Sequence, residues 1–269
     1  MLMRERSVDF RVPLTRVTIS PGDKLVAFLI EVTRDRVGIL RDITDVLSDL
    51  GLNLHNISAY VEGGRGAIYL VVNISGKPES IINDIKDKFS SINGIGRILY
   101  QISEREGLLI DTLNFPLMRY DDRIFTLTKE SWKTLTSDLI AILGSEAYHA
   151  IIYRIGYEMG KGFAENYVDI ARRTGIEEPM DVIRYVMSGM LAASGWGRSS
   201  LELGEDTLRV KIEENLEAEA SPKSSEPSCY FTKGVITGAL TRILRSPVEV
   251  KETKCRAAGD EYCEFIMRY

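Results

Sequence analysis

The fold is decided by Cys229-Tyr-Phe-Thr-Lys-Gly-Val-Ile-Thr-Gly238 and by Glu252-Thr-Lys-Cys255-Arg-Ala-Ala-Gly-Asp-Glu-Tyr-Cys263-Glu-Phe265. All three cysteines of the chain lie in these two stretches. Thiolate is a soft ligand that suits Zn²⁺, and a closed structural zinc site has four ligands. Three cysteines leave a fourth position to fill, for which the candidates are Glu252, Asp260, Glu261, His55 and His149.

Two other interpretations of the cysteines stay open at this point. Free cysteine is often a small buried apolar residue, and three cysteines also allow one disulfide with a spare thiol. The spacing from Cys255 to Cys263 is wider than the Cys-x2-Cys of a zinc knuckle. Spacing alone therefore does not separate a metal site from buried thiols.

The same stretches resemble the 4-vinyl reductase domain, and the resemblance runs from about Leu108 to the C-terminus. That family includes the sensor domains of aromatic-responsive bacterial activators and is related to core subunits of the TRAPP trafficking complex. Further marks are Leu143-Gly144, Gly156, Gly160 and Ser194-Gly-Trp-Gly197. The resemblance implies a zinc ion held by Cys229, Glu252, Cys255 and Cys263.

Length and composition limit the remaining possibilities. A chain of 269 residues with 44% apolar residues is long enough for two globular domains. Its net charge of −5 argues against a nucleic-acid partner. There is no apolar run of membrane-spanning length, and charged residues occupy the N-terminus where a signal peptide would be apolar. We expect a cytoplasmic protein with reduced cysteines, which favours metal over disulfide.

Residues 24–103 show the periodicities of a ferredoxin-like βαββαβ domain, preceded by an N-terminal arm over residues 1–23. Strands are predicted over 25–33, 53–61, 67–74 and 95–102, and amphipathic helices over 39–50 and 81–92.

Within this region, Thr33-Arg-Asp-Arg-Val-Gly-Ile-Leu40 and Gly51-Leu-Asn-Leu54 resemble an ACT domain. That family binds amino acids or similar small effectors where two such domains pair, although it commonly has proline where this chain has Val37. A glycine turn before a helix exposes backbone N–H groups that can bind a carboxylate. The predicted ligand-binding residues are Asp35, Val37, Gly38, Ile39, Leu40 and Asn53. Alternatively, Asp35 only offsets the helix dipole and the domain serves only for dimerisation.

Residues 108–269 are predicted to form a mixed α/β domain with a helical core and a small antiparallel sheet, so the whole chain is of the α+β class. Helices are expected over 130–143, 145–173, 180–193 and 231–244, strands over 198–203, 208–214, 248–253 and 262–268, and a loop over 218–228. Gly156, Gly160 and Gly162 lie inside a predicted helix, where glycine is unfavourable, and this indicates close helix packing or a kink.

A ligand pocket in this helical core is a further implication of the resemblance. Its candidate lining residues are Trp132, His149, Tyr153, Tyr185 and Trp196. Aromatic residues at helical spacing are more often simple core residues, so both interpretations stay open.

Together these features predict a regulatory, homodimeric protein. It would sense an amino acid or other small ligand through the ACT domain, and a hydrophobic or aromatic ligand or partner through the zinc-clipped C-terminal domain. Its output would need a separate protein. The alternatives are an enzyme or accessory acting on a tetrapyrrole vinyl group, and a TRAPP-like structural adaptor. No Gly-x-Gly-x-x-Gly, Walker loop or Ser/His/Asp set is present, so no catalytic residue is predicted and an enzyme is disfavoured.

Overall fold

The computed structural model describes residues 16–119 and 122–268. The chain divides into two compact units, Met1–Phe125 and Thr126–Tyr269, and each is described by itself. Most of the predicted N-terminal arm, residues 1–15, lies outside the described residues. No helix in the described ranges is long and apolar enough to cross a membrane.

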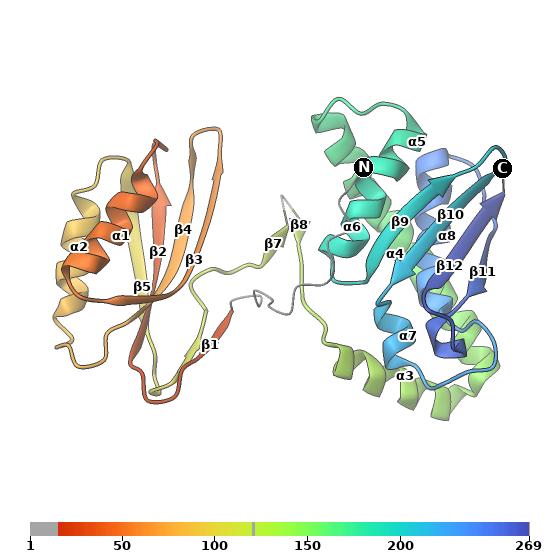
Figure 1. Ribbon diagram of the computed structural model, residues 1–269, viewed down its shortest axis with the longest axis horizontal. Coiled ribbons are helices and arrows are strands. Elements are labelled where there is room, and N and C mark those ends of the chain that lie inside the picture. Colours follow the sequence, from red (N-terminus) through yellow and green to blue (C-terminus); the bar gives the residue numbers. More distant parts are fainter. Residues whose placement is uncertain (1–15, 120–121, 269) are drawn as a thin grey trace. The chain divides into compact units, whose positions relative to one another are not determined.

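The first unit contains an antiparallel sheet of four strands in the order β3-β4-β2-β5, with two helices on one face (Figure 1). The elements are β2 (Leu25–Val32), α1 (Ile39–Asp49), β3 (Asn53–Glu62), β4 (Arg65–Asn73), α2 (Ile81–Ser90) and β5 (Ile95–Ile102). This confirms the predicted ferredoxin-like βαββαβ arrangement.

The two helices bury one apolar stripe each against the central strands. Ile39, Ile43 and Leu47 recur at helical spacing on α1 and are all buried. On α2, Phe89 packs edge to face on Phe28 of β2, with ring centroids 5.8 Å apart. These contacts hold both helices on the same face of the sheet.

The opposite face of the sheet is covered by a strand that comes later in the chain. Leu109 of β6 (Leu108–Ile110) is buried against Leu25, Ala27, Tyr69 and Val71. Strand β6 also pairs antiparallel with β1 (Val17–Ile19). Residues 108–119 and 122–125 therefore lie with the first unit, whereas the sequence predicted a second domain that begins at Leu108. The physical reason for this difference is that α1 and α2 cover only one face of the sheet, so the apolar side chains of the other face need a later segment to bury them.

A short hairpin, β7 (Met118–Arg119) and β8 (Asp122–Arg123), precedes the second unit. The second unit has an antiparallel sheet in the order β11-β12-β10-β9. Its strands are β9 (Arg198–Leu203), β10 (Thr207–Glu213), β11 (Val250–Lys254) and β12 (Cys263–Arg268). The main helices are α3 (Lys129–Leu143), α4 (Ser145–Arg173) and α8 (Tyr230–Leu244). The predicted helical core and small antiparallel sheet are confirmed.

Shorter helical segments depart from the sequence-based expectations. The helix expected over 180–193 is α5 (Pro179–Asp181), a π-helical segment η1 (Val182–Met187) and α6 (Ser188–Ala193). The expected loop over 218–228 begins inside a short helix, α7 (Leu216–Ala220). Asn215 caps α7, because its side-chain oxygen accepts from the backbone N–H groups of Glu217 and Ala218.

Helices α4 and α8 touch backbone to backbone through two pairs of glycines. A Cβ atom on Gly156 would lie 2.3 Å from the carbonyl oxygen of Phe231, and one on Gly160 would lie 2.1 Å from that of Val235. In the same way, Gly234 and Gly238 of α8 face the carbonyls of Tyr153 and Tyr157 at 2.2 and 2.0 Å. Only glycine fits at these four positions, which resolves the alternative in favour of close packing.

Helix α8 is buried on all sides, whereas the sequence suggested one buried face. Its glycines pack on α4, and Ile236, Ala239 and Leu240 pack into the core shared with the sheet. A helix that is apolar all round is typical of a central core element.

Gly160→Ala and Gly162→Ala test this contact with the same chemical change on one helix. We expect Gly160→Ala to destabilise the protein by about 1–3 kcal/mol, because the added methyl forces the helices apart. Gly162 has no atom within 4 Å of an added Cβ, so Gly162→Ala should stabilise by up to about 1 kcal/mol through helix propensity. Urea unfolding followed by tryptophan fluorescence measures both variants, since both tryptophans lie in the second unit. Equal effects of the two substitutions would contradict the proposed packing.

Candidate functional site

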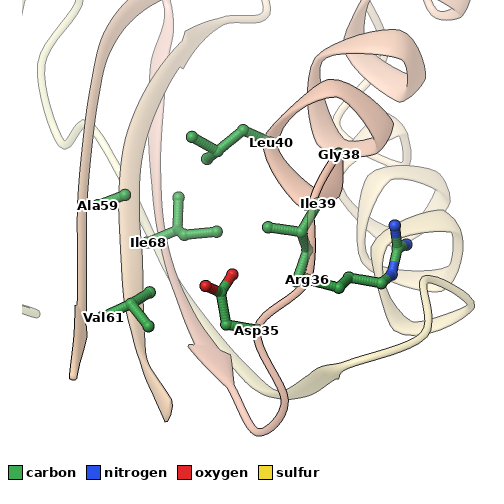
Figure 2. Close-up of a pocket in the computed structure, with 8 residues that line it drawn as sticks. All are labelled: Asp35, Arg36, Gly38, Ile39, Leu40, Ala59, Val61 and Ile68. Carbon is green, nitrogen blue, oxygen red and sulfur yellow. The ribbon is translucent and has the colours of Figure 1, made fainter. Parts of the chain in front are cut away.

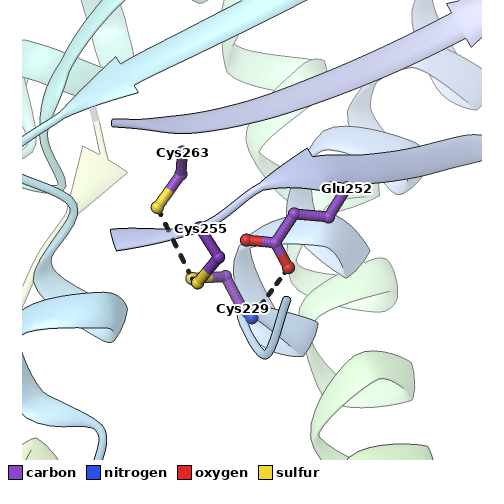
Figure 3. Close-up of side chains that lie close together, drawn as sticks. All are labelled: Cys229, Glu252, Cys255 and Cys263. Atoms are coloured by element: carbon purple, nitrogen blue, oxygen red, sulfur yellow. Dashed lines mark hydrogen bonds between the residues drawn. The ribbon is translucent and has the colours of Figure 1, made fainter. Parts of the chain in front are cut away.

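Four possible metal ligands converge beside the β11–β12 hairpin (Figure 3). Cys229 immediately precedes α8, Glu252 lies on β11, and Cys255 and Cys263 lie on the two sides of the hairpin turn. One potential ligand atom from each residue lies within 4.8 Å of all the others. The structure therefore brings together all four residues that the sequence predicted as metal ligands.

The hairpin has local features that turn its ligands to one side. Residue Thr253 is an extra residue in the pairing of β11 with β12, because Glu252 faces Phe265 and Lys254 faces Glu264. Side chains alternate along a strand, so the extra residue turns Cys255 toward the side of Glu252. The turn then closes through Asp260, whose side chain accepts from the backbone N–H of Cys255 at 2.8 Å.

The other candidates for the fourth ligand have different positions. The Asp260 carboxylate holds the turn, and Glu261 is exposed. His55 lies in the first unit, where it pairs with Asp23 at 3.4 Å. His149 stacks on Tyr230 with ring centroids 4.0 Å apart. Glu252 is the carboxylate that joins the three cysteines.

The sulfur positions suit a tetrahedral ion better than a disulfide. All three cysteines are buried as free thiols. The Cys229 Sγ lies 3.5 Å from the Cys255 Sγ and 3.7 Å from the Cys263 Sγ. Zn–S bonds of about 2.3 Å give a tetrahedral edge of about 3.8 Å, whereas a disulfide bond is about 2.05 Å.

Glu252 carries a buried oxygen that lacks a partner. Its Oε2 accepts from the backbone N–H of Cys229 at 2.9 Å, while its buried Oε1 has no hydrogen-bond partner. Burial, and after it the charge of Cys255, raises the pKa of Glu252 to about 8. An unpaired buried carboxylate oxygen is costly, and a cation at the centre of the cluster would satisfy it.

The Cys229 thiol lies within hydrogen-bonding distance of the other two thiols. Hydrogen bonds from Cys229 and then Cys263 hold the pKa of Cys255 well below its usual range. The hydrogen bond to Cys255 raises the pKa of Cys229. A bound divalent cation would replace the protons of these thiols. The four donors fill a tetrahedral shell completely, so the arrangement suits a structural ion and leaves no coordination position for a substrate.

A second candidate site is a groove of about 260 Å³ in the first unit, between the start of α1 and strands β3 and β4 (Figure 2). Four of its predicted residues, Asp35, Gly38, Ile39 and Leu40, line the groove. The other two predicted residues do not: the Val37 side chain is fully exposed, and Asn53 begins β3 away from the lining. Arg36, Ala59, Val61 and Ile68 also line the groove and were not predicted from the sequence.

The Asp35 carboxylate is an acidic group of the groove with no partner among the described residues. Its side chain points into the groove (Figure 2), and no hydrogen bond or ion pair of that carboxylate is found within the described residues. The Arg36 side chain points away, because its guanidinium donates to Asp42 and to the backbone oxygen of Asn93. The remaining walls are mainly aliphatic.

The residues predicted to line a C-terminal pocket fall into separate groups. Trp132 and Trp196 meet edge to face with centroids 5.7 Å apart, and Phe231, which the sequence analysis left out, contacts both. His149 lies on Tyr230, and burial lowers its pKa.

Tyr153 and Tyr185 lie apart from this aromatic contact. The ring of Tyr153 lies near Tyr157 and under the Lys233 ammonium. Tyr185 is 60% exposed beside Arg184. The structure thus brings together only the two tryptophans of the predicted set.

One buried acidic residue was not anticipated. Glu217 of α7 is 2% exposed and accepts from the backbone N–H groups of Phe231 and Thr232. Burial raises the pKa of Glu217 to about 7. The only sequence signal was an Asn215 cap before a short helical run, which is too weak to place a buried carboxylate.

A sequence model of a known protein family matches part of each unit. Residues 27–89 match the sequence model of the ACT domain, and residues 208–269 match that of the V4R domain, the 4-vinyl reductase family. The chain carries an ACT domain and a V4R domain. The groove residues Asp35 to Ile68 lie in the ACT match, and all four potential metal ligands lie in the V4R match. Both family resemblances seen in the sequence are confirmed.

Curated relatives come from Methanocaldococcus jannaschii. The uncharacterized protein MJ0150 is 30% identical over 119 residues, which cover 44% of this chain and 64% of that protein. The uncharacterized protein MJ0855 is 34% identical over 119 residues, covering 44% of this chain and 46% of that protein. The chain thus spans less than two thirds of the length of either relative.

Comparison with solved structures gave matches with TM-scores below 0.5, including these three. The phenol-responsive sensory domain of the transcription activator PoxR has a TM-score of 0.48 at 16% identity, covering 55% of this chain and 77% of that chain. A vinyl-4-reductase family protein from Methanocaldococcus jannaschii has a TM-score of 0.37 at 18% identity, covering 54% and 83%. The ACT domain of a GTP pyrophosphokinase from Chlorobium tepidum has a TM-score of 0.26 at 20% identity, covering 29% and 99%.

Glu252→Gln tests the candidate metal centre of the V4R domain through its effect on the stability and metal content of the protein. If a metal ion is bound, loss of the carboxylate ligand should destabilise the protein by about 3 kcal/mol or more and lower its metal content. If no ion is bound, the neutral amide should be tolerated, because a Glu252 carboxyl with a pKa of about 8 is already mostly neutral at pH 7. Chemical unfolding and elemental analysis of the purified protein measure the two quantities.

The control is Glu249→Gln, which makes the same charge change three residues earlier at an exposed position. It should leave both stability and metal content unchanged. A Glu252→Gln protein that is as stable as wild type and unaffected by a chelator would refute the metal centre.

Proposed function

We propose that this chain is a regulatory small-molecule-binding protein whose ACT domain senses an amino acid. The observation that carries this proposal is the groove beside α1, in which the unpaired Asp35 carboxylate faces mainly aliphatic walls. Its volume of about 260 Å³ lies just below the usual range for drug-sized ligand pockets, about 300–1,000 Å³. An effector of amino-acid size fits such a space.

The chemistry of the groove matches the three parts of an aliphatic amino acid. Asp35 would pair with the ammonium group. Gly38, at φ 90°, begins α1, and no side chain caps the helix there. The free N–H groups at this positive end of the helix can bind the ligand carboxylate. Ile39, Leu40, Ala59, Val61 and Ile68 would contact the side chain of the ligand.

In this proposal the V4R domain holds Zn²⁺ through Cys229, Glu252, Cys255 and Cys263. The ion would clip the start of α8 to both strands of the β11–β12 hairpin, so its binding free energy would become folding free energy. Support comes from the sulfur spacing and from the unpaired Oε1 of Glu252. Reduced thiols fit a cytoplasmic location.

The second domain would respond to a hydrophobic or aromatic ligand, or to a protein partner. The contact of Trp132, Trp196 and Phe231 supports an aromatic ligand. Ile151, Ile155 and Met159 form an exposed apolar stripe on α4 and support a partner or a second copy of the chain. This stripe also favours the second candidate function, a structural adaptor that works through its surface.

Asp35→Asn tests the effector site. We expect leucine, isoleucine or valine to raise the unfolding temperature of wild type, because a ligand at about 100 times its Kd adds about 2.7 kcal/mol of stability. Asp35→Asn should weaken that binding by about tenfold or more, since it removes a charge-assisted contact. Calorimetric titration and thermal unfolding measure both effects.

Asp45→Asn is the control, because Asp45 is an exposed acidic residue of α1 outside the groove lining. It should bind the effector like wild type. If no amino acid stabilises wild type, or if Asp35→Asn and wild type respond alike, the effector proposal fails and the adaptor is favoured.

A further inference from the structure

We propose that Glu217 is a positioning residue for the metal centre, and that it connects the centre to the tryptophan pair of the same domain. The inference rests on the proposed metal site and concerns a residue that is not one of its ligands. It assigns a function to α7, the short helix that the sequence did not reveal.

Glu217 binds the first turn of α8 with both carboxylate oxygens. Its Oε1 accepts from the backbone N–H of Phe231 at 2.9 Å. Its Oε2 accepts from the backbone N–H of Thr232 at 2.7 Å and from the Thr232 hydroxyl at 2.6 Å. N–H groups in the first turn of a helix have no partner within the helix, so a side chain must supply one. Here a buried carboxylate from another helix supplies it.

The same helix turn carries the metal ligand Cys229. Glu252 accepts from the backbone N–H of Cys229 at 2.9 Å, and Glu217 accepts from the N–H groups two and three residues further on. Two carboxylates therefore hold one turn, and one of them is itself a proposed ligand. Loss of Glu217 would free the turn, and with it the position of the Cys229 sulfur.

The segment that bears Glu217 is also attached to the turn between the other two cysteines. Glu219 lies 3.7 Å from Arg256, next to Cys255. The backbone N–H of Ser224 donates to the carbonyl of Ala257 at 2.9 Å. Helix α7 and the residues after it thus contact both sides of the cysteine cluster.

A chain of hydrogen bonds continues from Glu217 to the aromatic residues. The Thr232 hydroxyl donates to Glu217 and accepts from the Trp196 indole N–H at 2.9 Å. Trp196 in turn contacts Trp132. These two are the only tryptophans of the chain, so tryptophan fluorescence reports on the far end of this connection.

The test is Glu217→Gln, which keeps the size of the side chain but places an amide NH₂ against backbone N–H donors. Co²⁺ and Zn²⁺ are the probes, added to protein from which metal has been removed. We expect Glu217→Gln to weaken metal binding by about 10–100-fold, as is typical for residues that orient metal ligands. The thiolate-to-cobalt absorption should change in position or intensity, which helix capping remote from the ligands would not cause.

The control is Glu226→Gln, an identical charge change at an exposed position before Cys229. It should bind both metals like wild type. Thr232→Val keeps the backbone N–H that donates to Glu217 but removes the hydroxyl. We expect it to retain metal affinity within a few-fold and to lose the tryptophan fluorescence change that metal causes in wild type, whereas Thr232→Ser should restore that change.

Each outcome decides the proposal. Wild type that binds neither metal refutes the metal centre itself. Wild type that binds cobalt while Glu217→Gln binds it equally well, with the same spectrum, overturns the positioning role alone. If Glu217→Gln does not fold, the Thr232→Val variant decides. A metal-dependent fluorescence response like that of wild type overturns the proposed connection from Glu217 to Trp196. Loss of that response, with restoration in Thr232→Ser, supports the connection.

Discussion

The second unit depends on the backbone contact between α4 and α8. Gly156 and Gly160 of one helix, and Gly234 and Gly238 of the other, each lie where a Cβ would meet a carbonyl oxygen at 2.0–2.3 Å. This approach buries α8 on all sides between α4 and the sheet. A helix held so closely cannot slide without losing packing on both sides. Its first turn, and the Cys229 that precedes it, are therefore fixed relative to the sheet.

That fixed turn makes a costly cluster of ionisable groups possible. Three buried thiols and Glu252 converge on it, and Glu217 is buried close by. Burying carboxylates without partners is unfavourable. The backbone N–H groups at the start of α8 offset part of this cost, because they donate hydrogen bonds to the carboxylates of Glu217 and Glu252. A bound divalent cation would offset the remainder. The contact between α4 and α8, the hydrogen bonds from the first turn of α8 to Glu217, and the candidate metal centre are thus parts of one arrangement. Each of them requires the start of α8 to lie in the same place.

Much of this could be predicted from the sequence. The βαββαβ order followed from helical apolar periodicity in α1 and α2 and from apolar runs of strand length around them. Four of the six residues predicted to bind a ligand line the groove, because they are neighbours in a glycine turn and in the helix that follows it. The four residues predicted as metal ligands also come together in the structure, although the family resemblance, and not the spacing of the cysteines, selected Glu252. The groove residues of β3 and β4 were missed, because strand pairing brings them to α1 from a distance in sequence.

By itself, the sequence determined the main helices and strands of both domains, the glycines inside α4, and the side chains that can bind a metal. These are properties of local conformation and of single residues. Only the tertiary structure decided that Leu109 of β6 covers the first sheet, that Tyr185 lies on the surface, and that Glu217 meets the start of α8. Those outcomes depend on which apolar faces and which unpaired N–H groups remain after the elements pack. These uncovered faces and unpaired N–H groups exist only once the chain has folded, so no single segment of the sequence predicts them.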